Sequence, residues 1–306
     1  MNRKLIEFLQ LPETWRIPFF GGMWYRFLTK CDNKAIRKTK IKEPTLNKVE
    51  RDIFITASMT SFPARIGYVH LALKSLLLQS VKPDRVVLWL AEEQFPDKKL
   101  PDELIELQKY GVEINWCEDL YGHKKYYYCL KEQKSNEVII TFDDDIIYPV
   151  DCIKRLINTH KKFPGCLVCE RAQSIDYESD GSLKNPGKWK TLSDVGVKSP
   201  SYSLNPSPGG GCLIPYQGFY KDALDKEKIY KLAYKNDDLW YMFMAAEQGV
   251  RTIKTKKYHK LFTLIEGSQT TQMATENVVG NKNMQIMEIL KKEYPIAFNR
   301  ILQDKG

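Results

Sequence analysis

Residues 137–145, Glu-Val-Ile-Ile-Thr-Phe-Asp-Asp-Asp (EVIITFDDD), join a short apolar run to three consecutive carboxylates. The run is rich in β-branched residues, which is typical of a strand buried on both faces. Adjacent like charges repel one another, so three of them at the end of such a strand indicate that a cation offsets their charge. A hard divalent ion that bridges these oxygens to a diphosphate has this chemistry. The alternative is that residues 143–145 form a solvated turn.

Strand and helix signals alternate on either side of this stretch. The predicted strands are 52–58, 85–90, 112–117, 137–142, 166–170 and 250–253, with a short apolar segment at 212–216. The predicted helices are 67–80, 102–110, 124–134, 151–163, 237–248, 281–292 and 295–302. This alternation predicts an α/β fold whose central sheet is mostly parallel, with helices on both faces. Ligands of such a sheet bind beyond the carboxyl ends of the strands, where residues 143–145 fall.

The composition is that of a globular protein. Of the 306 residues, 43% are hydrophobic and 28% are charged, which excludes collagen-like, low-complexity and fully disordered chains. The sequence has no run of about eighteen apolar residues, which excludes a transmembrane helix. Glu7 interrupts the apolar residues near the N-terminus and no small-residue cleavage site follows, so we expect an unsecreted, cytoplasmic protein.

Positive charge is concentrated in residues 1–51. This basic leader holds twelve Lys and Arg against five Asp and Glu, so it carries +7 of the net charge of +9. Aromatic residues are interleaved with the cations, among them Trp15, Phe19, Phe20, Trp24, Tyr25 and Phe27. The pattern favours peripheral binding to an anionic membrane surface, on the inner face of the cell membrane. The alternatives are packing on the main domain and binding of nucleic acid, but no helix-turn-helix, zinc-finger or RNP pattern supports nucleic acid.

Two enzyme classes place an Asp-x-Asp sequence at the carboxyl end of a strand. Phosphohydrolases of the haloacid dehalogenase type use the first Asp as a nucleophile and have Thr or Val at the fifth position, where this chain has Ile147. Their motif also lies close to the N-terminus. In nucleotide-sugar transferases, by contrast, the acids hold a metal ion and the ribose. The second class therefore fits residues 143–145 better.

Four segments, in this order, resemble the bacterial family-2-type glycosyltransferases of capsule, O-antigen and cell-wall polysaccharide biosynthesis. They are residues 60–66 (TSFPARI), 88–93 (LWLAEE), 141–149 (TFDDDIIYP) and 236–240 (NDDLW). The resemblance covers about residues 52–255 and implies a GT-A fold, with a Rossmann-like nucleotide-binding half at about 52–150 and an acceptor half at about 151–255. Residues 256–306 are then a C-terminal helical extension.

The resemblance also implies a site for a nucleotide-diphosphate sugar, with UDP as the expected nucleotide. The donor residues would be Thr60 and Ser61 at the base and ribose, Glu92 at the uracil, Arg65 or Lys125 at the phosphate, Asp143 at the ribose and Asp144 beside it. For the phosphate, Arg65 is the better geometric match because its guanidinium is bidentate. Mn²⁺ or Mg²⁺ would be held by Asp145 with Asp144. His259 is a candidate further ligand, although a lone His in a basic stretch is more often structural.

Asp237 and Asp238 match the family's acidic pair at the start of a helix. The resemblance implies that Asp238 is the catalytic base and that Asp237 orients the acceptor or shares the proton. Two adjacent carboxylates push one pKa upward, which suits a base. The alternative is an ordinary helix N-cap formed by Asn236 or Asp237.

Three residues are candidates for binding the acceptor. Gly210 and Gly211 allow close approach of a sugar ring because they have no Cβ, and Trp189 could stack on the sugar. The alternatives are a flexible loop end for the glycines and local packing for Trp189.

The chain has no Gln-x-x-Arg-Trp motif, which favours transfer of a single sugar over processive synthesis. The expected activity is a metal-dependent, inverting glycosyltransferase acting on a polysaccharide or polyprenyl-linked saccharide. The alternatives are a non-catalytic GT-A-like binding module and a phosphohydrolase.

Overall fold

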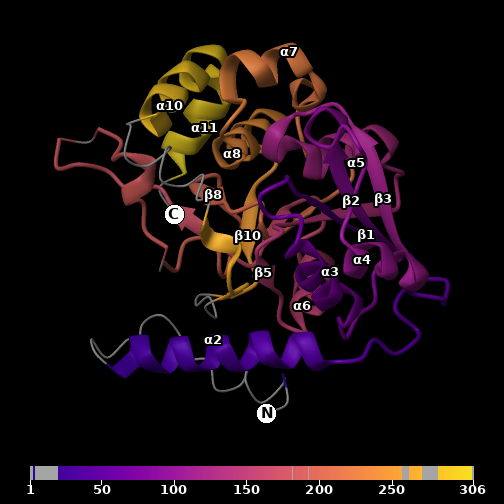
Figure 1. The fold of residues 1–306 in the computed structure, drawn as a ribbon. Coiled ribbons are helices and arrows are strands. Elements are labelled where there is room, and N and C mark those ends of the chain that lie inside the picture. The colour runs from indigo at the N-terminus through magenta and orange to yellow at the C-terminus, as the bar shows by residue number, and fades with distance from the viewer. Residues whose placement is uncertain are drawn as a thin grey trace.

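A seven-stranded sheet forms the centre of the protein (Figure 1). The computed structural model describes residue 3 and residues 20–180, 182–191, 193–256, 262–270 and 282–304. The strands of the sheet are β1 (Phe54–Thr60), β2 (Arg85–Ala91), β3 (Val112–Cys117), β4 (Glu137–Phe142), β6 (Leu167–Cys169), β9 (Gly210–Ile214) and β10 (Thr252–Lys254). Their order is β10-β6-β9-β4-β1-β2-β3. All neighbours are parallel except β9, which runs antiparallel to both β4 and β6.

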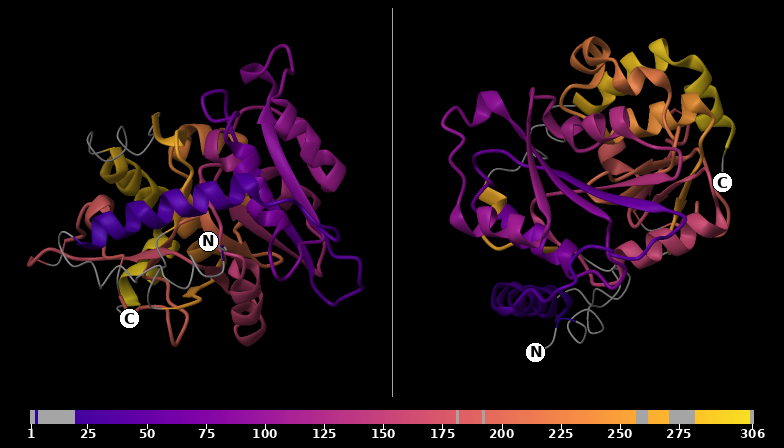
Figure 2. Two further views of the ribbon diagram at one scale, coloured as in Figure 1. Left: turned by 60° about the horizontal axis from the view of Figure 1, so that its bottom comes forward. Right: turned by 90° about the vertical axis from the view of Figure 1, so that its right-hand side faces the viewer.

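Helices cover both faces of this sheet (Figure 2). They are α2 (Phe20–Lys38), α3 (Val69–Leu77), α4 (Asp102–Glu106), α5 (Lys124–Glu132), α6 (Cys152–Lys162), α7 (Lys226–Lys228), α8 (Asp237–Gln248), α10 (Lys282–Glu293) and α11 (Pro295–Gln303). Two short antiparallel pairs complete the strands, β5 (Ile146–Ile147) with β11 (Thr263–Leu264) and β7 (Ala172–Ser174) with β8 (Leu204–Pro206). The predicted α/β class is therefore confirmed, with strand and helix ends that differ from the predicted ones by a few residues.

Side-chain alternation along the strands builds two cores. In β4, Ile139 belongs to a cluster shared with α5 and α8, whereas Val138 and Ile140 belong to a cluster shared with α3 and α6. Successive side chains of a strand point to opposite faces, so a strand buried on both faces is largely apolar. All six residues of β4 are buried, which explains the continuous apolar run before the acids.

The strand order creates a switch point between β1 and β4. From β1 the chain winds outward to β2 and β3, then returns through α5 to β4 on the opposite side of β1. The connections that follow β1 and β4 therefore leave the sheet in different directions beyond their carboxyl ends. Open α/β sheets bind ligands at such a switch point. Residues 143–145 follow β4 directly.

The helix α2 of the basic leader packs on the main body. It runs along one edge of the molecule, beside β11 and α3 (Figures 1 and 2). Asn33 is buried and donates to the Leu264 carbonyl at 2.9 Å, while its own side-chain oxygen accepts from the Glu266 amide at 3.0 Å. Packing is thus established for the inner face of α2. Among the described residues, no helix combines the length and hydrophobicity needed to cross a bilayer.

The last two helices pack directly on α8. Arg300 of α11 donates to the carbonyls of Ala246 and Glu247 at 2.6 and 2.8 Å, which lie at the end of α8. The Glu247 carboxylate in turn accepts from the Ala297 amide at 2.8 Å. These contacts satisfy backbone groups that helix ends leave unpaired. The C-terminal helices therefore stabilise the helix that carries Asp237 and Asp238.

Replacing Asn33 tests whether α2 is part of the folded core. Asn33→Ala removes the hydrogen bonds of a buried side chain to the Leu264 carbonyl and the Glu266 amide, so we expect the free energy of unfolding to fall by about 1–3 kcal/mol. Denaturant titration measures this change. The matched control is Lys34→Ala, an exposed position on the same helix, which should stay within about 0.5 kcal/mol of the wild type. Equal stability of the two variants would show that α2 contributes nothing through these contacts.

Candidate functional site

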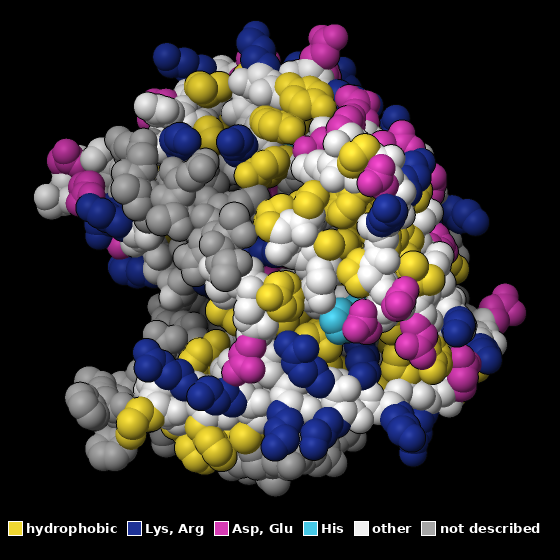
Figure 3. Space-filling model, viewed as in Figure 1, with side chains coloured by type: hydrophobic (Ala, Val, Ile, Leu, Met, Phe, Trp, Pro, Cys, Tyr) yellow, Lys and Arg dark blue, Asp and Glu magenta, His cyan; other side chains and the backbone are white. Residues whose placement is uncertain are grey.

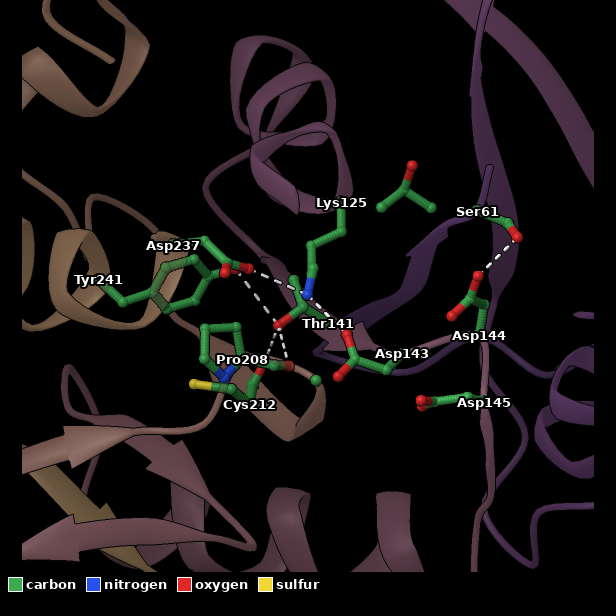
Figure 4. Close-up of polar contacts among 12 residues, drawn as sticks. Ser61, Lys125, Thr141, Asp143, Asp144, Asp145, Pro208, Cys212, Asp237 and Tyr241 are labelled. Atoms are coloured by element: carbon green, nitrogen blue, oxygen red, sulfur yellow. Dashed lines mark hydrogen bonds and ion pairs between the residues drawn. The ribbon is translucent and has the colours of Figure 1, made fainter. Parts of the chain in front are cut away.

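The residues that follow β1 and β4 meet across the switch point (Figure 4). The Ser61 hydroxyl donates to the Asp144 carboxylate at 2.6 Å. The Arg65 guanidinium lies 2.9 Å from Asp144 and 2.9 Å from Asp145, so one cation bridges the two acids. Asp144 and Asp145 are only 4% and 9% exposed. Asp144 and Asp145 are therefore not solvated, as the turn alternative requires, whereas the Asp143 side chain stays 40% exposed.

A second cation lies on the other side of the acids. Lys125, at the start of α5, is buried, and its ammonium lies 2.7 Å from Asp143 and 3.0 Å from Asp237. Burial would lower the pKa of Lys125, but the charges of Asp143 and Asp237 outweigh it and raise the pKa above its ordinary value. Lys125 is therefore a fixed positive charge that connects the end of β4 to the start of α8.

These ion pairs correct one expectation from the sequence. The three adjacent carboxylates were expected to need a bound cation, but Arg65 and Lys125 supply much of the counter-charge from within the chain. Both partners are far away in the sequence, and only the sheet brings them to residues 143–145. Compensation is incomplete, because two cations face four carboxylates in this network, those of Asp143, Asp144, Asp145 and Asp237.

The remaining negative charge is visible in the pKa values. Burial raises the pKa of Asp144 to about 6, although the Arg65 charge opposes this shift. Burial and then the charge of Asp143 raise the pKa of Asp145. A raised carboxylate pKa means that the ionised form lacks solvation or counter-charge. One more positive charge near Asp144 and Asp145 would therefore stabilise their ionised forms.

The oxygens present suit a metal ion that arrives with phosphate. Within the described residues, no group of three or more His, Cys, Asp or Glu side chains is arranged to hold a metal by itself. Mg²⁺ and similar ions need only one or two carboxylates when substrate phosphates supply the other ligands. Asp143 and Asp145 fit this requirement, although Asp145 also pairs with Arg65, whereas Asp144 is turned toward Ser61 as well as Arg65. The candidate ligand His259 lies outside the described residues.

The three polar residues at the start of α8, Asn236, Asp237 and Asp238, have different surroundings. Asn236 is the N-cap, because its side-chain oxygen accepts from the Leu239 amide at 2.9 Å. The two acids that follow are therefore not needed for capping. Burial would raise the pKa of Asp237, but the Lys125 charge outweighs it and lowers the pKa. Asp238 reaches solvent, yet the protein around it limits its hydration and, together with the Asp237 charge, raises its pKa to about 7.

A glycine segment closes one side of the site. Gly209 lies against Asp143, and a Cβ added at Gly209 would come within 1.6 Å of the Asp143 carboxylate. The Gly209 carbonyl accepts from the Asp143 amide at 3.2 Å. Gly210 and Gly211 belong to β9 and are buried, so the flexible loop end considered as an alternative is not what forms here. Asp143 makes the close approach at Gly209, whereas the nearest side-chain atoms to a Cβ at Gly210 and Gly211 belong to Arg171 and Cys152.

Three other predicted residues have local partners. The Thr60 hydroxyl donates to the Trp89 carbonyl of β2 at 2.9 Å. Glu92 follows β2, is exposed and pairs with Lys98 at 2.9 Å. Trp189 is 4% exposed, packs in the core beside α8 and donates to the Lys184 carbonyl at 2.9 Å. The expectation that Trp189 stacks on an acceptor is therefore wrong, because its ring is covered by the protein itself.

Two residues of the site were missed from the sequence. His123 is fully buried, and its ring contacts the Tyr126 hydroxyl at 3.0 Å and the Ala233 carbonyl at 2.9 Å. Burial lowers the pKa of His123, and Asp237 is the nearest opposing charge. Gln269 donates to Asp145 at 2.9 Å. His123 lies two residues before Lys125, a predicted site residue, so its position in the sequence could have indicated that it belongs to the site. Gln269 is far from the predicted site residues in the sequence, and no pattern indicated its role.

Comparison with known proteins gives distant structural likenesses. No protein-family model and no curated protein sequence matches the chain. A mannosyltransferase from Pyrobaculum calidifontis, in complex with GDP-mannose and Mn²⁺, is 12% identical with a TM-score of 0.49, over 98% of this chain and 80% of that chain. GalNAc-T7 with UDP, GalNAc and Mn²⁺ is 11% identical with a TM-score of 0.44, over 70% of this chain and 46% of that chain. The 4-diphosphocytidyl-2C-methyl-D-erythritol synthase from Anaerococcus prevotii is 13% identical with a TM-score of 0.41, over 77% and 100%. At these sequence identities and TM-scores the likenesses do not indicate the function, which has to follow from the residues of the site.

Proposed function

We propose that the protein is a metal-dependent GT-A glycosyltransferase that moves a single sugar from a nucleotide-diphosphate sugar to a saccharide acceptor. The observation that carries the proposal is the acidic site at the switch point. Asp143 and Asp145 lie there together, the pKa of Asp145 is raised by burial and by the charge of Asp143, and the pKa of a separate carboxylate, Asp238, is raised to about 7. The pair suits a metal-bound diphosphate, and Asp238 suits proton transfer near neutral pH. Three of the four sequence motifs supply residues of this site: Arg65 comes from 60–66, Asp143 and Asp145 come from 141–149, and Asp238 comes from 236–240.

The donor would lie beyond the carboxyl ends of β1 and β4. Its nucleoside would lie beside Thr60 and Ser61, in the proposed nucleotide half of about residues 52–150, with the diphosphate near Asp143 and Asp145. A bound Mn²⁺ or Mg²⁺ would offset the charge that develops on the leaving diphosphate. Arg65 holds Asp144 and Asp145 in place, and Lys125 does the same for Asp143.

Asp237 and Asp238 would divide the acid–base work. The Lys125 charge keeps Asp237 ionised, so Asp237 can orient an acceptor hydroxyl by accepting a hydrogen bond. Asp238 would take the proton of that hydroxyl as the oxygen attacks the sugar carbon and the bond to the diphosphate breaks. Two neighbouring carboxylates whose environments push their pKa values apart are typical of such a division. Direct attack on the carbon inverts the anomeric configuration.

The acceptor would be a polysaccharide or a polyprenyl-linked saccharide, bound by about residues 151–255, as in assembly of a bacterial capsule, O-antigen or cell wall. All seven cysteines are free thiols, which supports a reducing, cytoplasmic location.

The phosphohydrolase alternative is less favourable, because its nucleophile would be Asp143, which here is held by Lys125 and faces Gly209.

Removing the Asp145 carboxylate tests the metal assignment. We expect UDP to bind wild-type protein at least about tenfold more tightly with Mn²⁺ than with a chelator, and expect Asp145→Asn to lose this difference. Arg65 keeps Asp144 as a partner in the variant, so the fold should survive. Calorimetry measures both affinities. The control is Asp97→Asn, an exposed position that should behave as the wild type; a metal effect retained in Asp145→Asn removes Asp145 from the metal site.

Asp238→Asn tests the base. A base with a pKa of about 7 must be deprotonated, so kcat/KM for transfer should rise with pH up to about 7 and then level off. Asp238→Asn should lower kcat by about 10²- to 10⁴-fold, with UDP affinity unchanged. Initial rates of nucleoside diphosphate release with a panel of nucleotide sugars and acceptors measure the effect. Release of inorganic phosphate instead would indicate the phosphohydrolase.

The same variant makes a stability prediction. The folded-state pKa of Asp238 lies above its unfolded value, so stability present at low pH is lost as the pH rises through about 7. Asn at this position cannot ionise and avoids that loss. Asp238→Asn should therefore melt at a higher temperature than the wild type at pH 8, with a smaller difference at pH 5. An equal difference at both pH values would contradict the raised pKa.

A further inference from the structure

The outer face of α2 has a composition unlike the rest of the molecule. Its first turns expose Met23, Trp24 and Phe27 to 57%, 37% and 51%, and the rings of Trp24 and Phe27 are stacked with centroids 5.6 Å apart. Large apolar side chains that gather on one helix in water mark a contact surface. The inner face of the same helix is already packed on β11 and α3, so this surface is additional to the fold.

Positive charge continues the same face toward the C-terminus of α2. The exposed cations of the helix are Arg26, Lys30, Lys34, Arg37 and Lys38. The only acid in the helix sequence, Asp32, is 1% exposed and pairs with Arg3 at 2.9 Å. The helix α2 therefore exposes five cations and no acid of its own. In Figure 3 hydrophobic (yellow) and Lys or Arg (dark blue) side chains lie side by side along α2 at the bottom of the molecule.

Helical spacing aligns the two kinds of side chain. Met23, Phe27, Lys30, Lys34 and Lys38 are separated by four, three, four and four residues, which places them on one stripe of an α-helix. The stripe is apolar at one end and cationic at the other. A helix lying flat on a lipid surface uses this arrangement, with aromatic rings at headgroup depth and cations at the phosphates.

We propose that the outer face of α2 docks the protein on an anionic membrane surface. The partner is a bilayer containing anionic phospholipid, because its phosphates match the five exposed cations of α2, a helix whose single acid, Asp32, is buried. A protein partner fits less well, since lysine is depleted from protein interfaces. Nucleic acid would use the cations but leaves Met23 and Phe27 without a role.

Docking through α2 would fix how the site faces the membrane. Asn33 holds the Leu264 carbonyl and the Glu266 amide. Between them, the Ile265 amide donates to the Asp145 carbonyl at 2.8 Å. The helix and the acidic site are thus joined through one short segment. The docking proposal itself does not depend on the transferase activity, and its test measures lipid binding alone.

Vesicle sedimentation of the full chain tests the proposal. The protein should pellet with vesicles of phosphatidylcholine and phosphatidylglycerol, pellet far less with phosphatidylcholine alone, and release as salt screens the charges. Lys30→Glu with Lys34→Glu should weaken binding by at least about thirtyfold. Met23→Gln with Phe27→Gln, which keeps helix propensity, should weaken it by at least about tenfold.

The matched control is Lys231→Glu with Lys292→Glu. Both positions are exposed, lie near α7 and in α10, away from α2 in Figure 1, and change the net charge equally. This control should bind as the wild type, and all variants should keep the wild-type circular dichroism and melting temperature. Three results would overturn the proposal: no binding to anionic vesicles, equal loss in the control, or a short RNA or DNA duplex bound more tightly than vesicles through Lys30 and Lys34.

Discussion

The buried ammonium of Lys125 joins two parts of the molecule that the chain order keeps far apart. It pairs with Asp143 at the end of β4 and with Asp237 at the start of α8. A buried cation is stable only when it is paired and hydrogen-bonded, so Lys125 requires both acids to stay where they are. The glycine at position 209 lets the backbone lie against one of them. The site is therefore held by charge as much as by packing.

This arrangement distributes protons unequally among neighbouring carboxylates. Asp237 has a cation beside it and stays ionised, whereas Asp238 has the charge of Asp237 beside it and limited hydration. After β4, Arg65 bridges Asp144 and Asp145, but the pKa values of both acids remain raised. A site that is short of positive charge in the absence of ligand favours a cation brought by its substrate. That property is the physical basis of the proposed metal-dependent transfer.

The leader illustrates how one helix can serve two surfaces. Asp32 and Asn33 of α2 face inward and are nearly fully buried, whereas Lys30 and Lys34 face outward. Because 3.6 residues make one turn, residues close together in the sequence point to different sides of the helix. Packing and membrane binding, which the sequence offered as alternatives, are therefore compatible. The inner face supports the segment that reaches Asp145, and the outer face is the one that we propose binds lipid.

The sequence by itself determined most strands and helices of the central sheet region and the identity of the acids, but it did not predict α2 or the short strands β5, β7, β8 and β11. The apolar run 137–142 and the helix 237–248 were predicted with the bounds that the structure has, because periodicity and composition are local properties. It did not determine the partners: Arg65 with Asp144 and Asp145, Gln269 with Asp145, and the burial of Trp189 all depend on contacts between distant residues. Counter-charge, hydration and pKa are set by what the fold brings within a few ångströms, so only the tertiary structure decided them.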